Sequence, residues 1–310
     1  MDNGNCIVLN EGRGVRVCGT VMSAINNREY LFSDPKTFNY MNPENKLLSA
    51  INPDREKDKT KKAFWLFLTI IADKLTDSTR LYSRLAEFYE KHPDFFDLEK
   101  LMKTEIDMST ELKNGLGKVV HHPNQFIDNV KSNYVKLLSE YGPNPLKLFD
   151  ENDNCESAIK KLKKFKGYDE GIASLLLLFY SKYNIIDIQG LGPKADRHKI
   201  RISESCGVYE RKGNPRVDNV SRQLSSLLRK ICTEERINAG MLDAGLWVIG
   251  SRVCVRKSTG YCRVFCPLDN LCNKIQPITD KKNTRLYDPP RERKTQQLLP
   301  LNFSSLVGAG

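Results

Sequence analysis

The chain has 310 residues, with 49 Lys and Arg against 38 Asp and Glu, and a formal net charge of +11 at pH 7. Hydrophobic residues make up 40% and charged residues 28%, which is ordinary globular composition and excludes a wholly disordered chain. The excess of positive charge favours a polyanionic partner such as nucleic acid, because binding to phosphates releases condensed counterions.

The sequence predicts neither a secretory signal nor a membrane partner. MDNGNCIVLNEGRG lacks a basic leader followed by an apolar run. The longest apolar stretch, IASLLLLFY at 172–180, is shorter than the roughly 20 residues that cross a bilayer. We therefore expect a cytoplasmic, nucleoid-associated or nuclear protein. In such a reducing compartment, nine cysteines favour metal ligation over a disulfide framework.

In chain order, residues 1–59 are expected to form an N-terminal extension that is partly β, with strand-like pieces CIVLN and VRVCGTV. From Ala63 onward, apolar residues recur at three- and four-residue steps, which predicts two helices in AFWLFLTIIADKL and TDSTRLYSRLAEFYEKH. Further helices are predicted at 97–104, 124–141, 155–164, 169–183, 196–206, 217–232 and 233–249. The fold class is therefore mainly α, and the polar, basic residues 276–310 are expected to be a flexible tail.

Four cysteines fall within nineteen residues, with the spacing Cys254-x7-Cys262-x3-Cys266-x5-Cys272. The intervening loops are long enough for all four to reach one centre. Thiolates are soft ligands that bind zinc or an iron–sulfur cluster. The Cys-x2-Cys hooks typical of structural zinc sites do not occur in this segment. A [4Fe-4S] cluster is therefore predicted as the cofactor, with zinc as the alternative.

The segment GLWVIGSRVCVRKSTGYCRVFCPLDNLC, at 245–272, resembles the cluster loop of the endonuclease III-like helix-hairpin-helix DNA glycosylases. Their cysteines follow the pattern C-x6-C-x2-C-x5-C, and this chain has one extra residue in each of the first two gaps. In that family the basic loop lies against DNA. The resemblance therefore implies that Arg256, Lys257 and Arg263 bind DNA, with solvated surface charges as the alternative.

The segment GPKADRHKIRIS, at 192–203, is similar to the family signature V-D-x-H-V-x-R-V. The resemblance implies that Asp196 is the catalytic residue, placed at the start of a helix. There it would stabilise positive charge at C1′ as the base departs and orient a water. A structural helix cap is its alternative role. We expect His198 to be packed and Arg201 to be a structural ion-pair partner, while Asp187 ranks second as a catalytic carboxylate.

The segment FKGYDEGIASLLLLF, at 165–179, resembles the family hairpin L-P-G-V-G-x-x-T-A, whose glycines let backbone amides approach a DNA phosphate. Gly167 matches the first glycine. Asp169 replaces the second, where it is expected to tolerate left-handed geometry and to weaken phosphate binding. Gly171 occupies the place of the lysine that forms a Schiff base in bifunctional members, so the resemblance implies direct hydrolysis.

Other lysines near the hairpin leave a covalent route open as an alternative: Lys166, Lys194 and Lys199. Upstream, WLFLTIIADKLTDSTRLYSRL resembles the family's L-L-S-x-Q-T-T-D segment, with Lys74 in place of the Gln. In the family that Gln enters the duplex at the flipped nucleotide. The resemblance therefore implies that Lys74 binds DNA, and a surface lysine between helices is the alternative.

Taken together, the resemblance implies a two-domain helix-hairpin-helix DNA glycosylase fold with a C-terminal iron–sulfur cluster loop. A helical barrel would span 60–195, and a cluster domain would span 196–275 and pack against the N-terminal extension. The expected enzyme is a monomer that binds double-stranded DNA and hydrolyses the N-glycosidic bond of a damaged, mismatched or modified base. The alternatives are a glycosylase with lyase activity, a catalytically inactive DNA-binding module, and a zinc-stabilised nucleic-acid-binding protein.

Overall fold

The computed structural model describes residues 5–51, 59–73, 78–93, 114–115, 117–120, 122–254 and 259–273. Within these ranges the chain is mainly helical, which confirms the predicted fold class. Three of the predicted DNA-binding residues, Lys74, Arg256 and Lys257, lie outside the described residues. So do the helix expected at 97–104 and the tail expected at 276–310.

The elements of the first half of the chain are β1 (Cys6–Leu9), α1 (Glu11–Asn27), η1 (Tyr30–Ser33), α2 (Pro35–Met41), α3 (Asn45–Ile51), α4 (Lys59–Thr69), η2 (Ile70–Ala72), α5 (Ser78–Lys91) and α8 (Pro123–Tyr141). Those of the second half are η4 (Pro145–Leu148), α9 (Cys155–Leu162), α10 (Glu170–Lys182), α11 (Arg197–Ser205), β2 (Tyr209–Lys212), α12 (Val217–Glu234), α13 (Ala239–Val248), η5 (Ile249–Val253) and α14 (Thr259–Phe265).

The helices predicted at 124–141, 155–164, 169–183, 196–206 and 217–232 are confirmed as α8, α9, α10, α11 and α12, with ends displaced by at most a few residues. The prediction at 233–249 is wrong at its start, because α13 begins only at Ala239. Arg236 has a φ of 52°, which interrupts the helix. Asn238 then caps α13 by accepting a hydrogen bond from the backbone N–H of Met241 at 2.9 Å.

The strand expected in VRVCGTV is wrong, since this segment lies inside α1. The buried residues of α1 recur at the three- and four-residue steps of a helix face: Gly14, Val17, Cys18, Val21, Ala24 and Ile25. The strand expected in CIVLN is confirmed as β1, which pairs antiparallel with β2 from Cys6 opposite Lys212 to Leu9 opposite Tyr209. The sequence does not predict β2, a four-residue strand with only Tyr209 buried.

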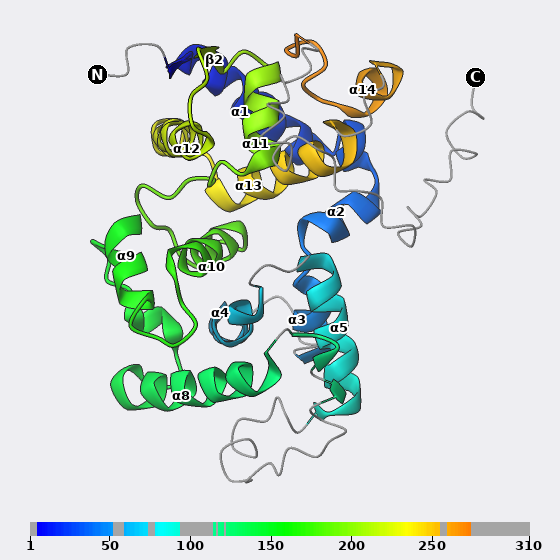
Figure 1. Cartoon of the computed structure of the whole chain (residues 1–310). Helices are drawn as coiled ribbons and strands as arrows, with labels where there is room; N and C mark the ends of the chain where they lie inside the picture. Colours follow the sequence, from blue (N-terminus) through cyan, green and yellow to red (C-terminus); the bar gives the residue numbers. More distant parts are fainter. Residues whose placement is uncertain are drawn as a thin grey trace, which may run out of the picture.

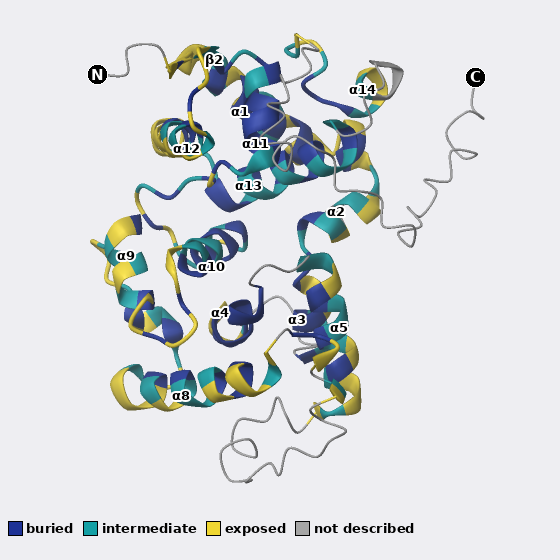
Figure 2. Cartoon of the chain, viewed as in Figure 1, coloured by how far each residue is buried: buried dark blue, intermediate teal, exposed yellow. Residues whose placement is uncertain are grey.

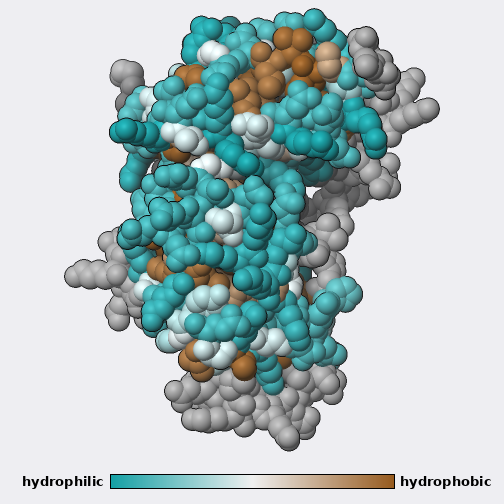
Figure 3. Space-filling model, turned by 90° about the vertical axis from the view of Figure 1, so that its left-hand side faces the viewer, coloured by the Kyte–Doolittle hydropathy of each residue, from teal (hydrophilic) through white to brown (hydrophobic). Residues whose placement is uncertain are grey.

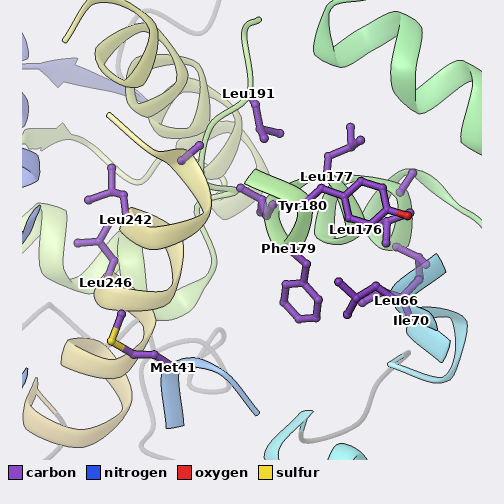
Figure 4. Close-up of a cluster of buried hydrophobic side chains, with 14 of the residues drawn as sticks. Met41, Leu66, Ile70, Leu176, Leu177, Phe179, Tyr180, Leu191, Leu242 and Leu246 are labelled. Carbon is purple, nitrogen blue, oxygen red and sulfur yellow. The ribbon is translucent and has the colours of Figure 1, made fainter. Parts of the chain in front are cut away.

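Helix α10 lies at the centre of the fold, between α13 on one side and α4 on the other (Figure 1). Figure 4 shows Leu176, Leu177, Phe179 and Tyr180 of α10 with Leu66 of α4 and Ile70 of η2 on one side, and Leu242 and Leu246 of α13 on the other. The hydroxyl of Tyr180 donates to the carbonyl of Ala63 at 2.7 Å, so that its polar atom is satisfied inside the core.

The outer helices expose one side each, whereas α10 is mostly buried (Figure 2). The N-terminal region packs against the second half of the chain: β1 pairs with β2, and α1 contacts both α12 and α13. The molecular face in Figure 3 is mainly hydrophilic, with hydrophobic residues gathered near its upper end. This arrangement places α11 beside α12, α13 and η5, where the candidate site is found.

Candidate active site and thiol cluster

Asp196 is the N-cap of α11, as the sequence predicts. Its carboxylate accepts hydrogen bonds from the backbone N–H groups of His198 at 2.8 Å and Lys199 at 3.0 Å. The preceding loop is held against α12, because the N–H of Ala195 donates to the Ser225 hydroxyl at 2.8 Å. The Asp196 side chain is 40% exposed. The carboxylate is therefore fixed in place and partly open to solvent.

A buried lysine joins Asp196 to a second carboxylate. Lys199 Nζ lies 3.0 Å from Asp196 Oδ2 and 3.0 Å from Asp243 Oδ1, and its side chain is only 3% exposed. Burial would raise the pKa of Asp196, but the Lys199 ammonium and N–H bring it below the usual value. Asp196 is therefore ionised at neutral pH. No sequence pattern points to Asp243, which reaches this pair from α13.

The same ion pairs hold Lys199 in its protonated form. Burial would lower the pKa of Lys199, but the carboxylates of Asp196 and Asp243 raise it above the usual value. A protonated amine is not a nucleophile, so Lys199 is poorly suited to attack C1′. Lys166 and Lys194 are exposed, and Lys166 Nζ donates to the hydroxyl of Ser132 on α8 at 3.1 Å.

His198 and Arg201 connect α11 to the turn that precedes the cysteines. His198 is buried, as expected, and its Nδ1 lies 3.2 Å from an Arg201 Nη. Arg201 donates to the carbonyl of Gly250 and forms a hydrogen bond with the Cys254 thiol. Its hydrogen-bond partners are thus a carbonyl, an imidazole and a thiol. Arg201 therefore joins α11 to the turn before Cys254, and the expected ion pair is replaced by these hydrogen bonds.

Acidification between pH 7 and 5 is expected to destabilise the protein through His198. Burial lowers the pKa of His198 to about 4, with Asp196 opposing the shift and Arg201 adding to it. In the unfolded state the His198 imidazole binds a proton near pH 6.5, whereas in the folded state it stays neutral until about pH 4. The free energy of unfolding therefore falls as the pH decreases from 7 to 5. The expected loss is roughly 2 kcal/mol. Urea unfolding at both pH values should show a smaller loss for His198→Asn, and equal losses would contradict this assignment.

Gly167 makes the turn between α9 and α10 with a φ of 83°, a left-handed conformation that favours glycine. A Cβ at this position would lie 3.1 Å from Asn129 Nδ2 and 3.3 Å from the Ile71 Cβ. The Asn133 amide fixes the turn further, since it accepts from the N–H and donates to the carbonyl of Lys166, both at 2.8 Å. A tight turn between two helices is therefore present at Gly167, where the resemblance places the hairpin.

The left-handed geometry expected for Asp169 is wrong. Its φ of −95° and ψ of 179° are extended, and its side chain caps α10 by accepting from the N–H of Ile172 at 2.9 Å. Helix capping explains an Asp here, because an acceptor is needed at the N-cap. Gly171 follows in the first turn of α10. Asp187, the second candidate carboxylate, is exposed in the loop after α10.

The four clustered cysteines come from three adjoining pieces of chain. Cys254 follows the π-helical turn η5, Cys262 lies in α14, and Cys266 follows α14 with its N–H bonded to the Cys262 carbonyl at 2.8 Å. Cys272 donates its N–H to the carbonyl of Leu268 at 2.9 Å. All nine cysteines lie in the described residues, and none of them forms a disulfide.

The thiols of the cluster are close enough to influence one another. Burial raises the pKa of Cys254, Cys272 and Cys262 raise it further, and Arg201 opposes the shift. Burial also raises the pKa of Cys266, which the other three clustered thiols raise further against a backbone hydrogen bond from Leu268. Within the described residues, no three His, Cys, Asp or Glu side chains already stand at metal-binding separations. The donor set nevertheless suits a thiophilic metal in its chemistry, because four soft sulfur atoms influence one another beside the Arg201 cation.

Of the residues predicted to contact DNA near the cysteines, Arg263 is described and is exposed on α14. A surface hollow at the start of α8 is lined by His122, Pro123, Asn124 and Gln125, and its lining does not include Asp196.

No protein-family model, curated protein or solved structure matches the chain. Across the part of the chain that the structure describes, we find no helix with both the length and the apolar character needed to cross a membrane. The geometry of the site therefore carries the functional proposal.

Proposed function

We propose that the protein is a DNA glycosylase that hydrolyses the N-glycosidic bond of a damaged, mismatched or modified base. One observation carries the proposal: Asp196 is an ionised, accessible carboxylate fixed at a helix start by two backbone N–H groups and a buried lysine. The similarity of residues 192–203 to the glycosylase signature implies that this carboxylate acts beside the deoxyribose of a bound nucleotide. The thiol cluster and the hairpin turn at Gly167 support the same reading.

The fixed charge of Asp196 suits the transition state of this reaction. As the base leaves with the electrons of the glycosidic bond, positive charge develops at C1′ and its ring oxygen, and a nearby carboxylate stabilises it. Asp196 also accepts a hydrogen bond from the attacking water, orienting it towards C1′. The water oxygen bonds to C1′, its proton is released, and the departing base is protonated. The products are the free base and an abasic site.

The target base must leave the stack before its C1′ can approach Asp196, as in other enzymes that act on bases. We propose that double-stranded DNA lies across the monomer between a helical barrel at 60–195 and a cluster domain at 196–275. The net charge of +11 favours this partner. Gly167 would meet the phosphate backbone, and Arg263 would contact it from α14, together with Lys74, Arg256 and Lys257.

The cysteines 254, 262, 266 and 272 would hold a [4Fe-4S] cluster. When bound, the cluster cross-links three pieces of chain and requires no redox step. Arg201 supports the first ligand, because it binds the Cys254 thiol from α11, the helix that Asp196 begins. Iron, sulfide and zinc analysis of the purified protein, with its visible spectrum, distinguishes this cluster from a zinc site.

A screen of duplexes tests the proposal. Each duplex carries one damaged, mismatched or naturally modified base, and the measurement is free base released per enzyme. We expect release from at least one duplex, without a covalent adduct after borohydride treatment. DNA binding without release from any duplex would favour the catalytically inactive DNA-binding module. The observation behind this alternative is the altered hairpin, where the negatively charged Asp169 caps α10. A trapped adduct would favour the lyase route.

A further inference from the structure

A fifth thiol lies at the cysteine cluster. Cys206 ends α11 and is only 2% exposed. Its thiol forms a hydrogen bond with the Cys272 thiol, and it interacts electrostatically with Cys254 and Cys266. It lies outside the 254–272 segment that carries the other four cysteines, so only the fold brings it to them.

The backbone around the pair is fixed by hydrogen bonds between the same two segments. The N–H of Asn273 donates to the carbonyl of Ser205 at 2.8 Å. Arg13 of α1 donates to the carbonyl of Cys206 at 2.7 Å and to the carbonyl of Leu271. Cys206 and Cys272 are therefore held side by side by their neighbours as well as by their own contact.

Other buried cysteines have different surroundings. Burial alone raises the pKa of the Cys18 thiol. The pKa of Cys232 is raised by burial and, beyond that, by Cys18 and Asp243. Cys18 and Cys232 therefore behave as packed thiols in the core between α1 and α12. Cys206 differs from both because three thiols of the cluster, those of Cys272, Cys254 and Cys266, raise its pKa.

We propose that Cys206 belongs to the metal centre as a fifth thiol and takes the ligand position of Cys272 when that thiolate is absent or released. The inference rests on the proposed metal centre. In the exchange, the metal–sulfur bond of Cys272 breaks as a bond to the Cys206 sulfur forms. The Cys206 proton passes to the Cys272 sulfur along their hydrogen bond, and no oxidation state changes. The metal then binds directly to α11, the helix that begins at Asp196.

Metal content of full-length cysteine variants tests this inference. Alanine is used because a serine oxygen can itself bind metal. Iron, sulfide and zinc per chain are measured after anaerobic purification. Cys266→Ala is expected to lose the metal, whereas Cys272→Ala retains it within about twofold of the wild type. The double variant Cys206→Ala/Cys272→Ala falls by at least about tenfold, as expected when a ligand position is left without a thiolate.

The double variant Cys232→Ala/Cys272→Ala is the matched control, because it removes a buried thiol that does not contact the cluster. It should retain as much metal as Cys272→Ala. The inference is overturned if Cys272→Ala loses metal as completely as Cys266→Ala, or if removal of Cys206 from Cys272→Ala has no effect. A wild-type protein without iron, sulfide or zinc would overturn the metal centre as well, so the two failures are distinguishable.

Discussion

Replacement of Asp196 by Asn is expected to lower base release roughly 100- to 1,000-fold while the protein remains folded. Asn is as good an N-cap as Asp, so it keeps the hydrogen bonds to the N–H groups of His198 and Lys199. Lys199 keeps Asp243 as its partner. The variant loses one of the two ion pairs of Lys199 and the negative charge that would stabilise C1′. Single-turnover release of free base from the best duplex in the screen measures the effect.

The matched control is Asp187→Asn, which removes an exposed carboxylate from the loop after α10. It should release base at the wild-type rate. Both variants should bind DNA as tightly as the wild type, measured by fluorescence anisotropy, because neither loses a positive charge. Full activity of Asp196→Asn would refute the catalytic assignment and leave Asp196 as a helix cap.

Replacement of Gly240 by Ala is expected to lower the free energy of unfolding by about 3 kcal/mol. Gly240 lies where α13 crosses α10, and its missing side chain allows the two backbones to touch. An added Cβ would overlap the carbonyl oxygen of Leu178 and lie 2.6 Å from the backbone N of Lys182. These are backbone atoms, so neither can rotate away and the two helices must separate. Urea unfolding followed by tryptophan fluorescence measures the loss.

Gly19→Ala is the control, since it makes the same change in an exposed part of α1 where no atom lies within 4 Å of the added Cβ. It should stabilise the protein by about 0.5–1 kcal/mol, because Ala loses less backbone entropy than Gly in a helix. Similar effects at the two sites would show that helix propensity, and not the close approach of α10 and α13, determines the result.

Much of the helical framework could be predicted from local patterns. Apolar residues at helical spacing gave α8, α10 and α12, since one buried face requires that period whatever it packs against. Asp196 was also recognisable as a residue that begins a helix. The pattern was ambiguous at VRVCGTV, where four of the seven residues are β-branched, a composition that favours a strand. Packing against α12 and α13 makes that segment a helix.

The sequence by itself determined the mainly helical character, the excess of positive charge, the four closely spaced thiols and the carboxylate that caps α11. Only the tertiary structure decided which distant groups surround them. Asp243 reaches Lys199, the i+3 partner of Asp196 within α11, because α13 packs on α11. Cys206 reaches Cys272 because Arg13 and Asn273 join their segments. The physical reason is range: periodicity and capping act within a few residues, whereas ion pairs and thiol contacts depend on packing between elements far apart in the chain.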